Sequence, residues 1–81
     1  MYTVYVLRDS QNKLYKGLTS NLDRRLKEHR SGHTRTTAKM KDLKVVYTES
    51  CQTFVEARKR ELYLKSAAGR RYLKKTIEMP R

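Results

Sequence analysis

Several features that mark other classes of protein are scarce in this sequence. Cys51 is the only cysteine, so the chain cannot form an internal disulfide, and one thiol does not make a zinc site by itself. No run approaches the roughly 18 consecutive apolar residues of a membrane-spanning helix. The N-terminus shows no charged segment followed by an apolar run, the pattern of a secretory signal. We therefore expect a cytoplasmic protein that does not enter a membrane.

Acidic residues are scarce as well. Eight Asp and Glu stand against 20 Lys and Arg, which gives a net charge of +12. The positive charge is concentrated in residues 24–44 and 58–81, whereas residues 45–57 carry only two charges, both acidic. A small domain this basic usually binds a polyanion, and nucleic acid is the default partner. The basic helices lack the wide aromatic or leucine-rich face that would favour an anionic membrane surface.

The 81 residues predict one domain, 1–81, with a small core over about 2–66. β-branched and aromatic runs predict strands at 3–7, 14–18 and 43–48. The turn-forming residues 9–12 join the first two strands, which favours an antiparallel hairpin.

Three helices are predicted from caps and periodicity. Ser20 caps the first in a capping-box pattern with Asp23, and Gly32 closes it. Thr53 caps the second, which runs from 54 to about 66 with Glu56 as capping-box partner. A break at Gly69 precedes a basic C-terminal helix, about 69–78.

The first helix places two polar residues beside its apolar stripe. Leu22 and Leu26 face the core, and Arg25 and His29 share their stripe, so these two reach the core's edge. Arginine stems often cover apolar surface, and a lone histidine is often structural. The alternative is an anion site.

The strands that precede this helix bring further polar groups. Tyr5 and Tyr15 lie on neighbouring strands and could face the same side, and Gly17 would allow a close approach of the backbone. The polar, basic loop 32–42 suits either phosphate contacts or simple exposure to solvent.

Glu61 is the unexpected residue of the second helix. The predicted apolar arc of that helix comprises Phe54, Val55, Ala57, Leu62 and Leu64. Glu61 falls inside this arc, and an inward carboxylate is costly unless it is paired or holds a cation. Three possibilities stay open: a pair with Lys65 at i+4, a pair with Arg25 or another inward base, or a divalent metal.

Taken in order, these residues resemble the GIY-YIG nuclease family, and in particular its small stand-alone, single-domain members. Residues 3–5 (Thr-Val-Tyr) occupy the place of the Gly-Ile-Tyr motif, and residues 15–17 (Tyr-Lys-Gly) that of Tyr-Ile-Gly. Residues 21–32 resemble the helix that follows, with Arg25 on the family's catalytic arginine and His29 on a position usually His or Tyr. Residues 56–65 resemble the helix of the metal-binding glutamate, which falls on Glu61. The departures are Thr3, Val4 and Lys16, and a proline missing after the basic loop.

The resemblance implies an α/β fold, a small three-stranded antiparallel sheet flanked by helices, and phosphodiester hydrolysis. Glu61 would hold Mg²⁺ or Mn²⁺, and Arg25 would bind the non-bridging phosphate oxygens. Tyr5 would position or deprotonate the attacking water with support from Tyr15, its pKa lowered by the metal and Arg25, and His29 would orient the nucleophile or accept a proton. The residues expected to bind flanking phosphates are Lys16, Arg24, Arg30, Arg35, Lys39 and Lys65.

Two functions from different classes follow. The first is a metal-dependent DNA endonuclease, structure-selective or weakly sequence-specific, of a kind that would suit DNA repair or recombination. The second is a nucleic-acid-binding module, for DNA or RNA, without turnover. We expect DNA rather than RNA, a monomer, and a partner protein wherever long-site specificity is needed.

Overall fold

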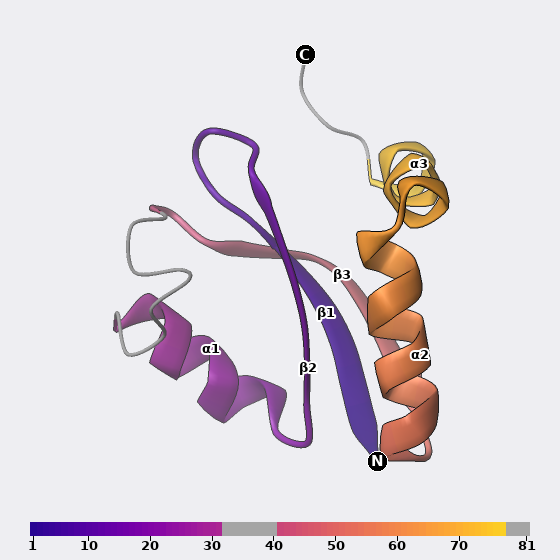
Figure 1. Ribbon diagram of the computed structural model, residues 1–81. Coiled ribbons are helices and arrows are strands. Elements are labelled where there is room, and N and C mark those ends of the chain that lie inside the picture. Colours follow the sequence, from indigo (N-terminus) through magenta and orange to yellow (C-terminus); the bar gives the residue numbers. More distant parts are fainter. Residues whose placement is uncertain (32–40, 78–81) are drawn as a thin grey trace.

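The computed structural model describes residues 1–31 and 41–77 (Figure 1). The predictions for Gly32, Arg35, Lys39 and the end of the last helix lie outside the described residues. The elements, in chain order, are β1 (Tyr2–Arg8), β2 (Leu14–Thr19), α1 (Leu22–Arg30), β3 (Lys44–Cys51), α2 (Phe54–Lys65) and α3 (Ala67–Thr76).

The three strands form an antiparallel sheet in the order β2-β1-β3, which confirms the predicted fold class and hairpin. In the turn between β1 and β2, the Asp9 carboxylate accepts hydrogen bonds from the backbone amides of Gln11 (2.9 Å) and Lys13 (2.8 Å). Strand β3 extends to Cys51, past the predicted end at residue 48. The central strand β1 is covered on both faces, so Val4 through Leu7 are all buried.

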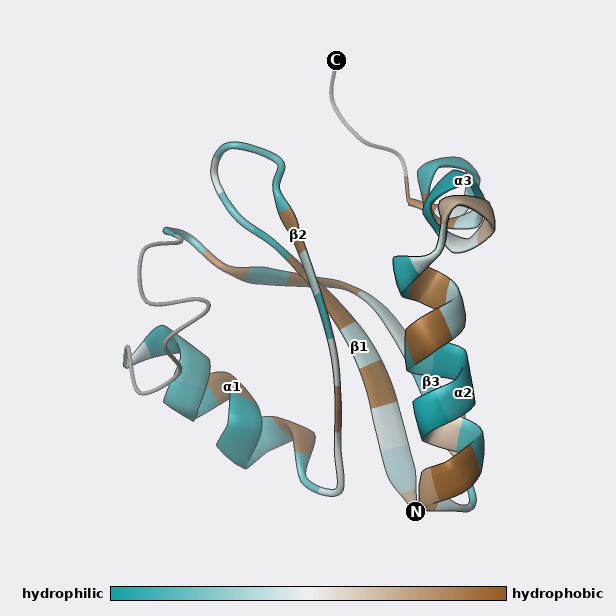
Figure 2. Ribbon diagram, viewed as in Figure 1, coloured by the Kyte–Doolittle hydropathy of each residue, from teal (hydrophilic) through white to brown (hydrophobic). Residues whose placement is uncertain are grey.

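Helices cover both faces of this sheet (Figure 1). On one face Val4 and Val6 pack with Ala57 and Leu64 of α2 and with Leu73 of α3. On the other, Tyr5 and Leu7 form a second cluster, against which Leu22 and Leu26 of α1 pack. Figure 2 shows α1 as a mostly hydrophilic helix interrupted by short hydrophobic stretches, as the predicted stripe requires.

The first helix begins one residue later than its predicted cap. Asn21, not Ser20, is the N-cap, because its side-chain oxygen accepts the Arg24 amide at 3.1 Å. Asp23 therefore lies in the first turn, where a carboxylate stabilises the helix dipole. The Thr53 cap of α2 is confirmed, with its hydroxyl oxygen 3.2 Å from the Glu56 amide.

The apolar arc predicted for α2 is partly wrong. Ala57 and Leu64 are buried, but Phe54, Val55 and Leu62 are at least half exposed. A three-stranded sheet is narrow, so it covers only the stripe 57, 61 and 64 of the helix. Glu61 lies within that stripe, with 7% of its surface exposed.

Gly69 does not break the chain as predicted. It lies inside α3, which begins at Ala67, and Ser66 is the N-cap, its hydroxyl oxygen accepting the Gly69 amide at 3.2 Å. A Cβ atom on Gly69 would stand 1.9 Å from the carbonyl oxygen of Tyr63. The missing side chain therefore lets α3 pack directly against the backbone of α2.

We expect Gly69→Ala to destabilise the protein, although alanine is the better helix former by about 1 kcal/mol. The new methyl group meets backbone atoms that cannot turn aside, so denaturant unfolding should show a loss of about 1–3 kcal/mol. The control Ala68→Ser, at an exposed neighbouring position, should change the unfolding free energy by no more than about 0.5 kcal/mol. A Gly69→Ala protein as stable as wild type would contradict this packing.

Candidate active site

Three rings from three elements meet on the α1 side of the sheet. Tyr5 comes from β1, Tyr15 from β2 and His29 from α1. The Tyr5 hydroxyl oxygen lies 2.7 Å from Nε2 of His29 in a buried hydrogen bond. The ring of Tyr15 has its centroid 6.3 Å from that of Tyr5 and 5.0 Å from that of His29. The expected neighbourhood of the two tyrosines is thereby confirmed.

Gly17 makes this arrangement possible. It pairs with Tyr5 across the β1–β2 ladder, and the end of the Tyr5 ring lies over it. A Cβ atom at residue 17 would stand 2.7 Å from both Cζ and the hydroxyl oxygen of Tyr5, and 3.1 Å from Cε1 of Tyr15. The close approach predicted at Gly17 is confirmed, and the group that approaches it is the ring of Tyr5.

Burial sets the protonation of the hydrogen-bonded pair. Tyr5 is fully buried, which raises its pKa, and the nearby Arg25 only partly opposes the rise. Burial, followed by the positive charge of Arg25, lowers the pKa of His29. At neutral pH Tyr5 therefore keeps its proton and His29 is uncharged, so the tyrosine can donate to the imidazole. The expected lowering of the Tyr5 pKa is not found in the protein alone.

Arg25 lies at the edge of this cluster, as the helical stripe predicted. Hydrogen bonding with Tyr5 raises its pKa, and its Nη1 lies 3.7 Å from the Glu28 carboxylate. About a third of its side chain (35%) is exposed, against 72% for its neighbour Arg24. Arg25 is therefore a permanent cation that touches the tyrosines and also reaches solvent. Arg24 and Arg30 lie on the exposed face of α1.

Glu61 lies on α2, which packs on the opposite face of the sheet from α1. Its carboxylate accepts a hydrogen bond from Nη1 of Arg58 and lies 3.6 Å from Nζ of Lys65. Of the pairs that the sequence left open, the one with Lys65 is found and the one with Arg25 is not, since Arg25 contacts Glu28 instead. Arg58 was missed, although its i+3 spacing could have indicated it. The charge of Glu61 still contributes to the raised pKa of Tyr5, so the two groups share one electrostatic environment.

The donor set around Glu61 limits which cation could bind. Within residues 1–31 and 41–77, no group of three or more His, Cys, Asp or Glu could hold a metal. A single carboxylate does not suit Zn²⁺, which takes three or four protein ligands. It does suit Mg²⁺ or Mn²⁺, hard cations that keep waters and bind through one or two carboxylates and the substrate's phosphates.

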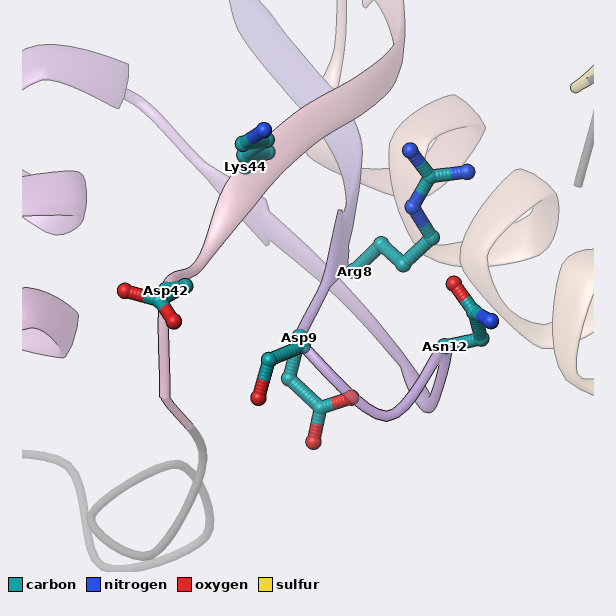
Figure 3. A pocket seen from close by; sticks show the side chains of 6 residues that line it. Arg8, Asp9, Asn12, Asp42 and Lys44 are labelled. Atoms are coloured by element: carbon teal, nitrogen blue, oxygen red, sulfur yellow. The ribbon is translucent and has the colours of Figure 1, made fainter. Parts of the chain in front are cut away.

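A separate hollow lies where β1 ends and β3 begins, and Figure 3 shows it from close by. It is lined by Arg8, Asp9, Ser10, Asn12, Asp42 and Lys44, so its two cations and two carboxylates balance. The Asp9 carboxylate is already used by the amides of the turn. This hollow contains none of the predicted catalytic residues.

The comparison with known families agrees with the fold. Residues 1–75 match the model of the GIY-YIG catalytic domain. The chain therefore belongs to the GIY-YIG family, whose members are typically nucleases acting on nucleic acid and generally use divalent metals. Among the described residues, no helix combines the length and the hydrophobicity needed to cross a membrane.

The particular relatives are UPF0213 proteins. One from Desulfotalea psychrophila is 36% identical over 70 residues, 84% of this chain and 64% of that protein, so the chain spans less than two thirds of this relative. One from Clostridium perfringens is 38% identical over 66 residues, 80% of this chain and 71% of the relative. The solution NMR structure of a UPF0213 protein from Bacillus halodurans superposes with a TM-score of 0.58 at 29% identity, covering 93% of this chain and 84% of that one.

The lowered pKa of His29 predicts how stability depends on pH. A histidine whose folded pKa lies below its unfolded value of about 6.5 stabilises the fold above that value. This contribution is lost as the pH falls from about 6.5 through the folded pKa. The unfolding free energy of the wild type, measured with denaturant, should therefore decrease between about pH 7 and pH 5.

The matched variant is His29→Gln, which has no titrating ring at this position. Its unfolding free energy should change less over the same pH range, whatever its absolute stability. The other histidine, His33, is present in both proteins and so cancels in the comparison. Parallel pH dependences in the two proteins would show that His29 is not the group responsible.

Proposed function

We propose that the protein is a divalent-metal-dependent endonuclease that hydrolyses phosphodiester bonds in DNA, with structure-selective or weak sequence preference. The observation that supports this most is the buried hydrogen bond between Tyr5 and His29, with Arg25 beside it. It joins a potential proton donor, a neutral base and a permanent cation in one place. General acid–base chemistry on a phosphate ester needs these three kinds of group.

Each side chain then has a role that its surroundings suit. Arg25 binds the non-bridging oxygens of the scissile phosphate with its fork of donors. Tyr15, which is partly exposed, orients the attacking water. Because Arg25 lies beside Tyr5, a phosphate bound by Arg25 would bring the attacking water to the Tyr5 hydroxyl. Tyr5 then accepts the proton of the water while passing its own to Nε2 of His29, so its raised pKa is no obstacle.

Glu61 is the residue that would hold Mg²⁺ or Mn²⁺, together with substrate oxygens and waters. Such a cation supplies charge stabilisation for the phosphoryl group and the leaving oxygen. Arg58 and Lys65 now occupy the carboxylate, and both are about half exposed, so both can turn away toward solvent. A non-catalytic nucleic-acid-binding module is the second candidate, because the same two ion pairs would also satisfy a purely structural Glu61.

Arg25 and Arg24 provide a matched test, since they are adjacent and carry the same charge. Arg25→Ala should lower the cleavage rate about a hundredfold or more at saturating DNA, because a group that stabilises transition-state charge is lost. Arg24→Ala should weaken binding and leave the saturated rate nearly unchanged, since its side chain is 72% exposed. Equal, mild losses in both would mean that α1 is only an electrostatic face.

Glu61→Gln separates the metal role from the structural one. It should abolish cleavage with Mg²⁺ and with Mn²⁺ while DNA binding persists, because the charge that holds the cation is gone. The melting temperature without metal should stay at or above that of the wild type, since the half-exposed partners are not left buried and unpaired.

Glu56→Gln is the control, with the same charge change at an exposed position of the same helix. It should keep its cleavage activity. A Glu61→Gln protein that melts lower but still cuts would return Glu61 to the structural role. A wild type that binds DNA but cleaves it with neither Mg²⁺ nor Mn²⁺ would favour the binding-module alternative.

A further inference from the structure

A second concave surface lies on the side of β2 away from the catalytic tyrosines. This pocket has a volume of about 390 Å³ and is lined by Asn12, Leu14, Lys16, Arg70, Arg71 and Lys74, and we call it the basic pocket. Four of its six lining residues are cations and none is a carboxylate. Its residues come from the hairpin and from α3, which are far apart in sequence, so only the tertiary fold brings them together.

The alternation of β2 explains the position of the basic pocket. Tyr15 points toward Tyr5 and α1, so Lys16 points to the opposite face. Leu14, which shares the face of Lys16, packs against the core cluster formed with α2 and α3. Strand β2 lies at an edge of the described sheet. Tyr15 and Lys16 are neighbours on this strand, so the candidate active site and the basic pocket lie on its two faces.

The cations of the basic pocket are not neutralised by the protein. Within the described part of the chain, no ion pair joins Lys16, Arg70, Arg71 or Lys74 to a carboxylate. Burial, and then the positive charges of Arg70 and Lys65, lower the pKa of Lys16. The hollow of Figure 3 differs in this respect, because its two carboxylates balance its two cations.

An anion in this pocket would offset the repulsion that Lys16 experiences from Arg70. Two arginines offer planar forks of donors that match phosphate oxygens, and Lys16 and Lys74 add ammonium groups. The partial burial of Lys16 reduces the screening of its charge by solvent. The pocket therefore has the composition of a phosphate site and lacks the aromatic platform on which a base would stack.

We propose that the basic pocket binds a non-scissile phosphate of the nucleic-acid strand whose scissile phosphate lies at Arg25. The proposal deepens the function proposed above and rests on it. The strand then passes around the edge of the sheet at β2, from Tyr15 to Lys16. The pocket would also give a role to the basic residues of α3, a helix that carries none of the proposed catalytic groups.

The test compares two variants with equal loss of charge. The first carries Arg70→Gln and Lys74→Gln in the basic pocket. The control carries Lys44→Gln and Lys59→Gln, both exposed and neither lining the basic pocket. Binding of labelled DNA is measured by fluorescence anisotropy in EDTA over a series of salt concentrations, so the result does not depend on cleavage.

The slope of log affinity against log salt should decrease by about 0.9 for each duplex phosphate that the variant no longer neutralises. We expect a decrease of about one in the pocket variant and a clearly smaller decrease in the control. The pocket variant should melt at or above the wild-type temperature at low salt, because it relieves the repulsion around Lys16. Equal slope changes in the two variants would overturn the proposal, since they would reflect net charge alone.

Shortening the DNA one nucleotide at a time from each end gives a second measurement. Wild-type affinity should fall to that of the pocket variant once one particular end becomes too short to reach the basic pocket. A decline in affinity that is gradual and equal from both ends would also contradict the pocket.

The two proposals can fail separately. If the pocket variant loses more slope than the control but the wild type never cleaves, the endonuclease is refuted and the phosphate site is supported. If the wild type cleaves but the two variants show equal slopes, the phosphate site alone is refuted.

Discussion

The rest of the candidate site depends on one contact, the Tyr5 ring lying over Gly17 with its hydroxyl on His29. The glycine leaves room for the end of the ring, and the 2.7 Å hydrogen bond fixes it from the α1 side. Together they hold a strand and a helix in one arrangement and bury two titratable groups. That burial keeps the tyrosine protonated and the histidine neutral, which makes the pair suitable for transferring a proton.

The distribution of charge explains a second feature of the molecule. With 20 basic and 8 acidic residues, carboxylates are scarce, and most of the described ones have partners. Glu49 accepts a hydrogen bond from Arg60 at 2.6 Å, Glu28 contacts two arginines of α1, and Glu61 is held by Arg58 and Lys65. Among the described residues, Lys16, Arg70, Arg71 and Lys74 line the basic pocket without an ion pair to a carboxylate. The protein thus retains repulsion that a polyanion would relieve.

The edge strand β2 connects the two proposals. Because side chains alternate along a strand, Tyr15 lies with Tyr5 and His29 in the candidate site, and Lys16 lines the basic pocket. At the position where the family motif has an isoleucine, this chain has a lysine. The resemblance marked that lysine as a departure. In the fold Lys16 lies away from Tyr5, so it leaves the candidate site unchanged and adds a cation to the other face.

The sequence by itself determined the order and type of the elements, the stripe that carries Arg25 and His29, and the inward position of Glu61. These depend on local periodicity and capping, which short stretches of chain encode. Boundaries and faces that depend on neighbours were less predictable. The N-cap of α1 is Asn21 and not the predicted Ser20, and Phe54 lies on the exposed side of α2. Gly69 is a packing contact between two helices and not a break. Each of these features depends on where another element lies.

The tertiary structure alone decided the environment of the candidate catalytic groups. Local sequence indicated that Tyr5 and His29 could be functional, but only their burial against each other sets the direction of both pKa values. The tertiary structure also brought Lys16 to the arginines of α3. The physical reason is that desolvation and charge coupling depend on distances through space, whereas a sequence pattern specifies only distances along the chain.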